Sequence, residues 1–135
     1  MPSSNVEYAI QTIVEALPDV AGIYIFGSAG TNFEKKDSDI DLAILTISPI
    51  LPAFLWDLSQ IIAVHLSKDV DLINLKDAST VFCFQIISTG KRVYCRDQAI
   101  CDEFEMLAYS SYLRLNEERK EIIDAIKKRG QIFNG

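Results

Sequence analysis

Three short runs of β-branched and aromatic residues limit what this chain can fold into, because each is long enough for one buried strand. Two of the runs open with the same triplet, an aspartate, an apolar residue and a second aspartate. The runs are AGIYIF at 21–26, DIDLAIL at 39–45 and DVDLINL at 69–75. Runs of this kind, bounded by glycine, proline and polar residues, predict strands. Residues 92–94 (RVY) predict a further short strand at an edge of the sheet.

The stretches between these runs carry apolar residues at helical spacing, so the chain predicts an α/β fold with a small sheet. We expect Asp77 to cap the third helix and Gly90 to stop it. Asp97 is expected to cap the last helix, and Gly130 to end it. The expected helices cover residues 5–16, 53–67, 78–88 and 97–129.

The length of the chain, 135 residues, is typical of one domain that buries its own core. No linker, repeat or low-complexity segment interrupts the pattern of elements. We therefore expect a single domain over 1–135, with a core at about 5–97 and a helical tail at about 97–130.

The charge and composition exclude several classes of function. The net charge of −6 argues against direct nucleic-acid binding, because proteins that grip DNA or RNA present a basic face. The first ten residues do not resemble a signal peptide, and the apolar stretches are shorter than the roughly 20 residues that span a bilayer. Three cysteines without a C-x-x-C pair favour a reducing compartment, so we expect a cytoplasmic protein.

The two aspartate pairs are the strongest chemical signal in the chain. Side chains alternate along a strand, so Asp39 and Asp41 point to one face, about 7 Å apart. Carboxylates gathered in this way are either solvated strand ends or ligands of a hard cation such as Mg²⁺. Asp71 would add a third carboxylate from the next acidic strand, as a metal ligand, a general base or both.

Gly27 and Ser28 follow the first predicted strand directly. A glycine there lets the backbone approach a phosphate, and the Ser28 hydroxyl can donate a hydrogen bond to it. On its own such a pair is more often an ordinary turn. The whole pattern is more specific: a strand, Gly-Ser, ten residues, Asp-x-Asp opening a strand, and then a further acidic strand.

This pattern, Gly27-Ser28-x10-Asp39-x-Asp41, resembles the signature of the DNA polymerase β-like nucleotidyltransferases. The segments FGSAGTNFEKKDSDIDLAIL and VDLINL are most similar to those of the minimal nucleotidyltransferases, or MNT proteins. The resemblance implies the small mixed sheet of that family, with helices packed on it. It also implies that Gly27 and Ser28 bind the nucleotide, and that Asp39, Asp41 and Asp71 are catalytic acids holding two Mg²⁺ ions.

One departure from the family pattern concerns the phosphate-binding loop. Many members have an arginine and a glycine shortly after Gly-Ser, where this chain has Thr31 and Asn32. Lys35 or Lys36 could supply a positive charge, although a lysine is not a bidentate replacement for arginine. These lysines could equally be solvated loop residues.

The resemblance also implies a partner and a reaction. MNT proteins often accompany HEPN-domain ribonuclease toxins, and the expected activity is transfer of AMP from ATP to a toxin tyrosine, which makes the chain an antitoxin. A complex with the toxin would follow from this. Two alternatives stay open at this stage: an antitoxin that neutralises by binding alone, and an aminoglycoside-type enzyme that modifies a small molecule.

Overall fold

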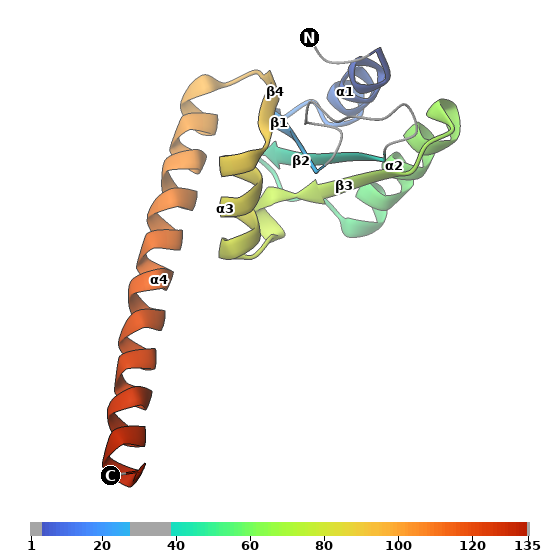
Figure 1. The fold of residues 1–135 in the computed structure, drawn as a ribbon. Coiled ribbons are helices and arrows are strands. Elements are labelled where there is room, and N and C mark those ends of the chain that lie inside the picture. The colour runs from blue at the N-terminus through green and yellow to red at the C-terminus, as the bar shows by residue number, and fades with distance from the viewer. Residues whose placement is uncertain (1–3, 28–38, 135) are drawn as a thin grey trace.

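The computed structural model describes residues 4–27 and 39–134, with side chains described as far as residue 129. Helices and strands follow one another much as the sequence predicts (Figure 1). The elements are α1 (Ser4–Ala16), β1 (Val20–Phe26), β2 (Ile40–Thr46), α2 (Pro52–Leu66), β3 (Val70–Asn74), the 3-10 turn η2 (Leu75–Asp77), α3 (Thr80–Thr89), β4 (Lys91–Cys95) and α4 (Gln98–Asn134).

The four strands form one mixed sheet in the order β3-β2-β1-β4. β1 pairs antiparallel with both β2 and β4, whereas β2 pairs parallel with β3. The parallel pair needs a crossover connection, and α2 supplies it. The predicted α/β fold with a small mixed sheet is therefore confirmed, including the short edge strand β4.

The alternation of side chains divides the core between the two faces of the sheet. On one face Ile23, Leu42 and Leu72 pack with the buried side chains of α1 and α2. On the other face Tyr24 and Ala43 belong to a second cluster, which buries apolar side chains of α3 and the start of α4. Figure 1 shows α1 and α2 on one side of the sheet and α3 on the other.

The start of α3 differs from the sequence prediction. Its N-cap is Ser79, whose hydroxyl accepts a hydrogen bond from the Phe82 amide at 3.1 Å. Asp77 was predicted to be this cap, but it lies in η2, which is capped in turn by Asn74. The helix starts later because the chain leaves β3 through this tight turn.

Gly90 ends α3, as predicted, but for a different reason from the one expected. Its φ of −87° is not left-handed. A Cβ atom at this position would instead collide with the carbonyl oxygens of Ile25 and Ile86. The glycine is required because the chain passes closely over β1 as it enters β4.

α4 begins as predicted, with the Asp97 carboxylate accepting a hydrogen bond from the Ile100 amide at 3.2 Å. The prediction that Gly130 ends the helix is wrong, because α4 continues to Asn134. A glycine inside a helix costs about 1 kcal/mol relative to alanine, which does not by itself stop a long helix.

The first turns of α4 are held by polar and aromatic contacts. The Tyr24 hydroxyl donates to Glu105 at 2.8 Å, and Arg92 bridges Asp102 and Glu105. The Phe84 ring of α3 packs against the α4 aromatics Tyr109 and Tyr112. These aromatic side chains of α4 thus cover α3, and α4 then extends away from the sheet (Figure 1).

Within residues 4–27 and 39–134, none of the helices combines the length and the apolar character that a membrane span requires.

The close approach at Gly90 gives a first testable prediction. Gly90→Ala should lower the free energy of unfolding by about 1–3 kcal/mol, because the added methyl group overpacks against backbone atoms. Urea unfolding measures this. The matched control is Ser88→Ala, an exposed change in the same helix, which should stay within about 0.5 kcal/mol of wild type. Equal stability of both variants would contradict the collision.

Candidate active site

The site lies where the end of β1 meets the beginnings of β2 and β3. The antiparallel register pairs Phe26 with Asp41, so Gly27 follows directly beside this aspartate. The parallel register pairs Asp41 with Asp71. Both carboxylates belong to positions on the face away from α1 and α2, since Leu42 and Leu72 face those helices.

Gly27 is required here for two reasons. Its φ of +74° lies in the left-handed region, which side chains rarely adopt. A Cβ atom would also lie 2.6 Å from a carboxylate oxygen of Asp41. The backbone therefore passes unusually close to this acid, and the two predicted site residues are in direct proximity.

The surroundings of Asp41 disfavour its ionised form. Burial raises the pKa of the Asp41 carboxyl, and the neighbouring carboxylates of Asp71 and Asp39 raise that pKa further. All three causes disfavour the ionised form, so a bound cation would relieve a real electrostatic cost. Carboxylates that gather to bind a cation are expected to show such a raised pKa in the absence of the metal.

The described carboxylates supply the oxygen ligands that Mg²⁺ prefers, but they do not form a complete set of protein ligands. Within residues 4–27 and 39–134, no three His, Cys, Asp or Glu side chains gather closely enough to hold one metal ion. Asp39 lies just before β2 and is exposed, as is Asp71. Mg²⁺ usually takes only one or two protein carboxylates and completes its shell with water and substrate phosphates. An open carboxylate cluster therefore suits it.

Several sequence predictions fall outside the described residues. Ser28, Lys35 and Lys36 lie there, together with the departures from the family pattern at Thr31 and Asn32. The structure places Gly27 against Asp41 and pairs Asp41 with Asp71, while Asp39 lies two residues before Asp41. The roles of all these positions stay predictions.

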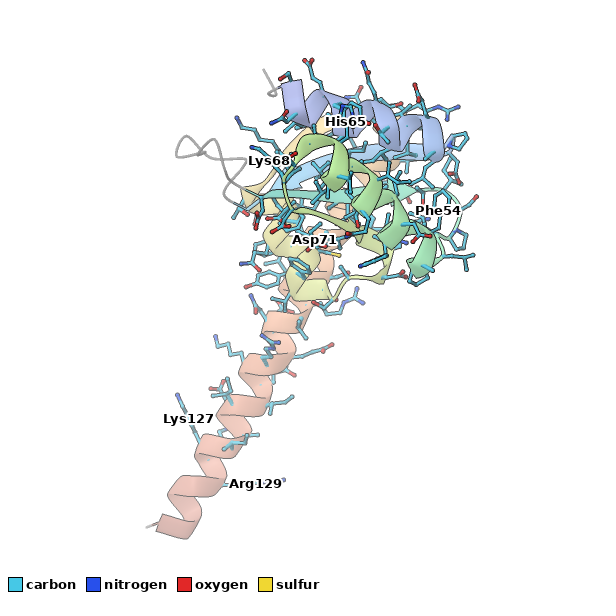
Figure 2. All side chains as sticks on the ribbon, turned by 90° about the vertical axis from the view of Figure 1, so that its right-hand side faces the viewer. Phe54, His65, Lys68, Asp71, Lys127 and Arg129 are labelled. Atoms are coloured by element: carbon cyan, nitrogen blue, oxygen red, sulfur yellow. The ribbon has the colours of Figure 1, made fainter. Side chains whose placement is uncertain are left out.

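Lys68 is a cation near the acids that the sequence reasoning missed. It lines a hollow of about 630 Å³ together with Asp39 and Asp69, at the end of α2. In Figure 2 it lies near His65, while Asp71 lies on the neighbouring strand β3. The available signal was its position directly before the second acidic strand, since a lysine there reaches the same end of the sheet.

The single histidine and one of the cysteines have surroundings that do not indicate catalysis. His65 is exposed and its ring stacks on Tyr8 with a centroid separation of 3.9 Å. Cys83 is buried and donates to the Leu75 carbonyl, and burial raises the pKa of its thiol. A thiol in that state is a poor nucleophile.

Comparisons with known proteins show which family the chain is similar to. The family model described as "Polymerase beta, Nucleotidyltransferase" matches residues 9–99. The chain is 35% identical over 127 residues to the protein adenylyltransferase MntA of Shewanella oneidensis (strain ATCC 700550 / JCM 31522 / CIP 106686 / LMG 19005 / NCIMB 14063 / MR-1). This alignment covers 93% of this chain and 90% of that protein.

Two solved structures extend the comparison. A toxin–antitoxin crystallised with AMP-PNP superposes with a TM-score of 0.80 at 33% identity, covering 92% of this chain and 98% of that one. A tri-AMPylated Shewanella oneidensis HEPN toxin in complex with its MNT antitoxin matches with a TM-score of 0.77 at 33% identity. That match covers 93% of this chain and 98% of the other.

The raised pKa of Asp41 gives a stability prediction for the metal-free protein. Asp41→Asn should raise Tm at pH 7 by about 1–3 °C, a modest gain because the group is partly solvated. The sign follows from the linkage: a carboxyl with a raised pKa destabilises the fold when ionised. The gain should therefore shrink as the pH falls through that pKa and protonates the wild-type residue.

The control for this experiment is Asp57→Asn, which removes an exposed carboxylate from α2. It should leave Tm unchanged in differential scanning calorimetry, both at pH 7 and at a lower pH where the Asp41 carboxyl of wild type is protonated. A lower Tm for Asp41→Asn at pH 7 would mean that the carboxylate stabilises the fold, contrary to this interpretation.

Proposed function

Because this chain belongs to the polymerase beta nucleotidyltransferase family, we propose that it transfers AMP from ATP to a hydroxyl of a HEPN toxin and so acts as an antitoxin. The observation that carries this proposal is the pairing of Asp41 with Asp71, directly beside Gly27. The similar solved structures support ATP as the AMP donor and a HEPN toxin as the partner. One is a toxin–antitoxin with AMP-PNP, and another contains a tri-AMPylated HEPN toxin.

The nucleotide is held at the Gly27 side of the site. The backbone at Gly27 is accessible to a phosphate because glycine carries no side chain of its own and this residue is exposed, and Ser28 follows it in the chain. Lys68 and the loop lysines Lys35 and Lys36 are candidates for further charge compensation of the triphosphate. Lys68 is the best supported of these candidates, because it lines the same hollow as Asp39.

Asp39, Asp41 and Asp71 would hold Mg²⁺, with two ions expected for this arrangement of acids. When bound, Mg²⁺ neutralises phosphate charge and makes the acceptor hydroxyl more acidic. The hydroxyl oxygen then forms a bond to the α-phosphorus, and the bond from that phosphorus to the bridging oxygen breaks. Pyrophosphate leaves, and Asp71 takes the proton of the hydroxyl as general base.

The acceptor in this proposal is a tyrosine of the toxin, and the reaction takes place in the cytoplasm, where ATP is abundant and cysteines stay reduced. All three cysteines of the chain are free in the structure, which is compatible with that compartment. A tyrosine hydroxyl has a pKa near 10, well below that of an aliphatic alcohol, so a carboxylate base can assist its deprotonation more easily.

The surface of the chain favours a protein partner over a nucleic acid. Its net charge is −6, which suits a basic partner protein. The helix α4 also exposes several large apolar side chains, and exposed apolar surface commonly marks a protein interface. They are Met106, Leu107, Leu113, Ile122, Ile123 and Ile126.

This apolar surface also favours a second candidate, an antitoxin that neutralises the toxin by binding alone. α4 extends away from the sheet and the acids (Figure 1), so contacts along it would not need a working site. The two candidates differ in one respect: only the enzyme requires Asp41 for neutralisation.

The decisive test is AMP transfer to the purified HEPN toxin with ATP and Mg²⁺, followed by intact-protein mass spectrometry. Wild type should add AMP to the toxin, and Asp41→Asn should lower the rate by about 100-fold or more, because a metal ligand is lost. Asp57→Asn, which removes an exposed carboxylate from α2, should transfer AMP at the wild-type rate.

Two results would contradict the enzyme. One is tight binding of the toxin without any transfer from ATP, GTP, CTP or UTP. The other is full neutralisation of the toxin in cells by Asp41→Asn. Either would favour the binding-only antitoxin.

Mg²⁺ binding has its own prediction, read without the toxin. Mg²⁺ with AMP-PNP should raise the wild-type Tm by several degrees, because ligands that bind only the folded state stabilise it. The double variant Asp39→Asn/Asp41→Asn should gain little. Removing the metal with EDTA should abolish the wild-type gain, and a gain that survives EDTA would show that the acids do not act through a metal.

A further inference from the structure

A groove of about 510 Å³ opens beside Asp71 and is not used by the nucleotide site described above. α2 forms one wall, and the turn into α3 forms the other. Its apolar lining includes Leu55, Trp56, Ile73 and Phe82, while Asp71 and Asp77 contribute carboxylates.

The groove follows the free edge of β3. Four consecutive residues, Asp71 to Asn74, line it. Their side chains point alternately to the two faces of the sheet, so only a groove along the edge of the strand can touch all four. β3 stands at the end of the sheet order and pairs only with β2 among the described strands. Edge strands of this kind can accept an extended peptide.

The position of the groove relative to the nucleotide is set by the order of strands. Gly27 follows β1, Asp41 lies on β2 and Asp71 on β3, so the acids stand between the glycine and the groove. Phosphoryl transfer needs the attacking and leaving oxygens roughly in line on opposite sides of the phosphorus. With the phosphates at Gly27, the attacking hydroxyl has to arrive from the side of Asp71.

The exposure of Trp56 is a second observation which indicates that a protein partner binds in the groove. Its side chain is 64% exposed although it lines the groove. An exposed tryptophan at the rim of a groove is a common anchor for a protein partner, because it buries a large area when covered. Figure 2 looks onto this side of the molecule, with Asp71 between α2 and α3.

We propose that this groove binds the acceptor segment of the protein substrate in extended form along β3, with the acceptor hydroxyl at Asp71. The proposal rests on the AMP-transfer function above and specifies how its acceptor is chosen. The apolar walls favour an aromatic, hydroxyl-bearing side chain, because the smaller side chain of a serine or threonine would fill the groove less well. A basic residue of the segment would lie near the Asp77 carboxylate.

The first test uses Trp56 as a probe, because it is the only tryptophan of the chain. The chain is labelled with 5-fluorotryptophan and the HEPN toxin is left unlabelled, so that one ¹⁹F resonance reports on the groove. We expect the resonance to shift with the toxin and not with Mg²⁺ and AMP-PNP alone. A shift with the nucleotide alone would mean that Trp56 stacks on the base, and an unchanged resonance with saturating toxin would mean that the groove is empty; either overturns the proposal.

The second test measures AMP transfer as a function of toxin concentration. Trp56→Ala should raise the toxin concentration for half-maximal transfer about tenfold or more, with the dependence on ATP unchanged. The matched control is Ile61→Ala, which removes a side chain that is 59% exposed on the same helix and does not line the groove. This control should behave as wild type.

The outcomes separate this proposal from the function on which it rests. If wild type transfers AMP and Trp56→Ala needs the same toxin concentration for half-maximal transfer, the proposal that the groove binds the acceptor segment is overturned. The proposed AMP-transfer function would still stand. A change in the ATP dependence alone would also overturn it. If wild type transfers no AMP, the proposed function fails, and the ¹⁹F experiment with the toxin still decides whether the groove is occupied.

Discussion

The structure depends on a repulsive contact that strand pairing enforces. The parallel register of β2 and β3 sets Asp41 against Asp71, and burial together with these neighbouring carboxylates raises the pKa of Asp41. The opposite face of the same strands supplies the compensation, because Leu42 and Leu72 are buried there against α2. Apolar burial on one face thus holds together charges on the other that would separate in a flexible peptide.

The contrast between the two faces explains why so small a sheet can hold a cluster of carboxylates. On the face toward α1 and α2, β2 and β3 bury Ile40, Leu42, Ile44, Val70 and Leu72. The other face changes from core to acid within one strand: Ala43 and Leu45 pack in the second cluster, while Asp41 lies nearer the open end. α3 packs on the apolar part, and Gly90 lets the chain turn tightly over β1 to complete the sheet.

Local patterns predicted most of this fold because they report local physics. Runs of β-branched and aromatic residues identified the strands of the described ranges, helical apolar spacing identified their long helices, and the Asp97 cap was correct. The errors were also physical in origin. Asp77 can cap a helix, but η2 placed Ser79 at the start of α3, and Gly130 can end a helix, but its cost was too small to do so.

By itself, the sequence determined which residues could do chemistry: the glycine after a strand, the aspartates two apart and the acid on the next strand all follow from residue order. Only the tertiary structure decided which of them meet. The register of β2 with β3 pairs Asp41 with Asp71, and the chain path brings Lys68 beside Asp39. The groove at the β3 edge combines residues from α2, β3 and α3. No local pattern encodes it, because its walls come together only when both faces of the sheet have packed.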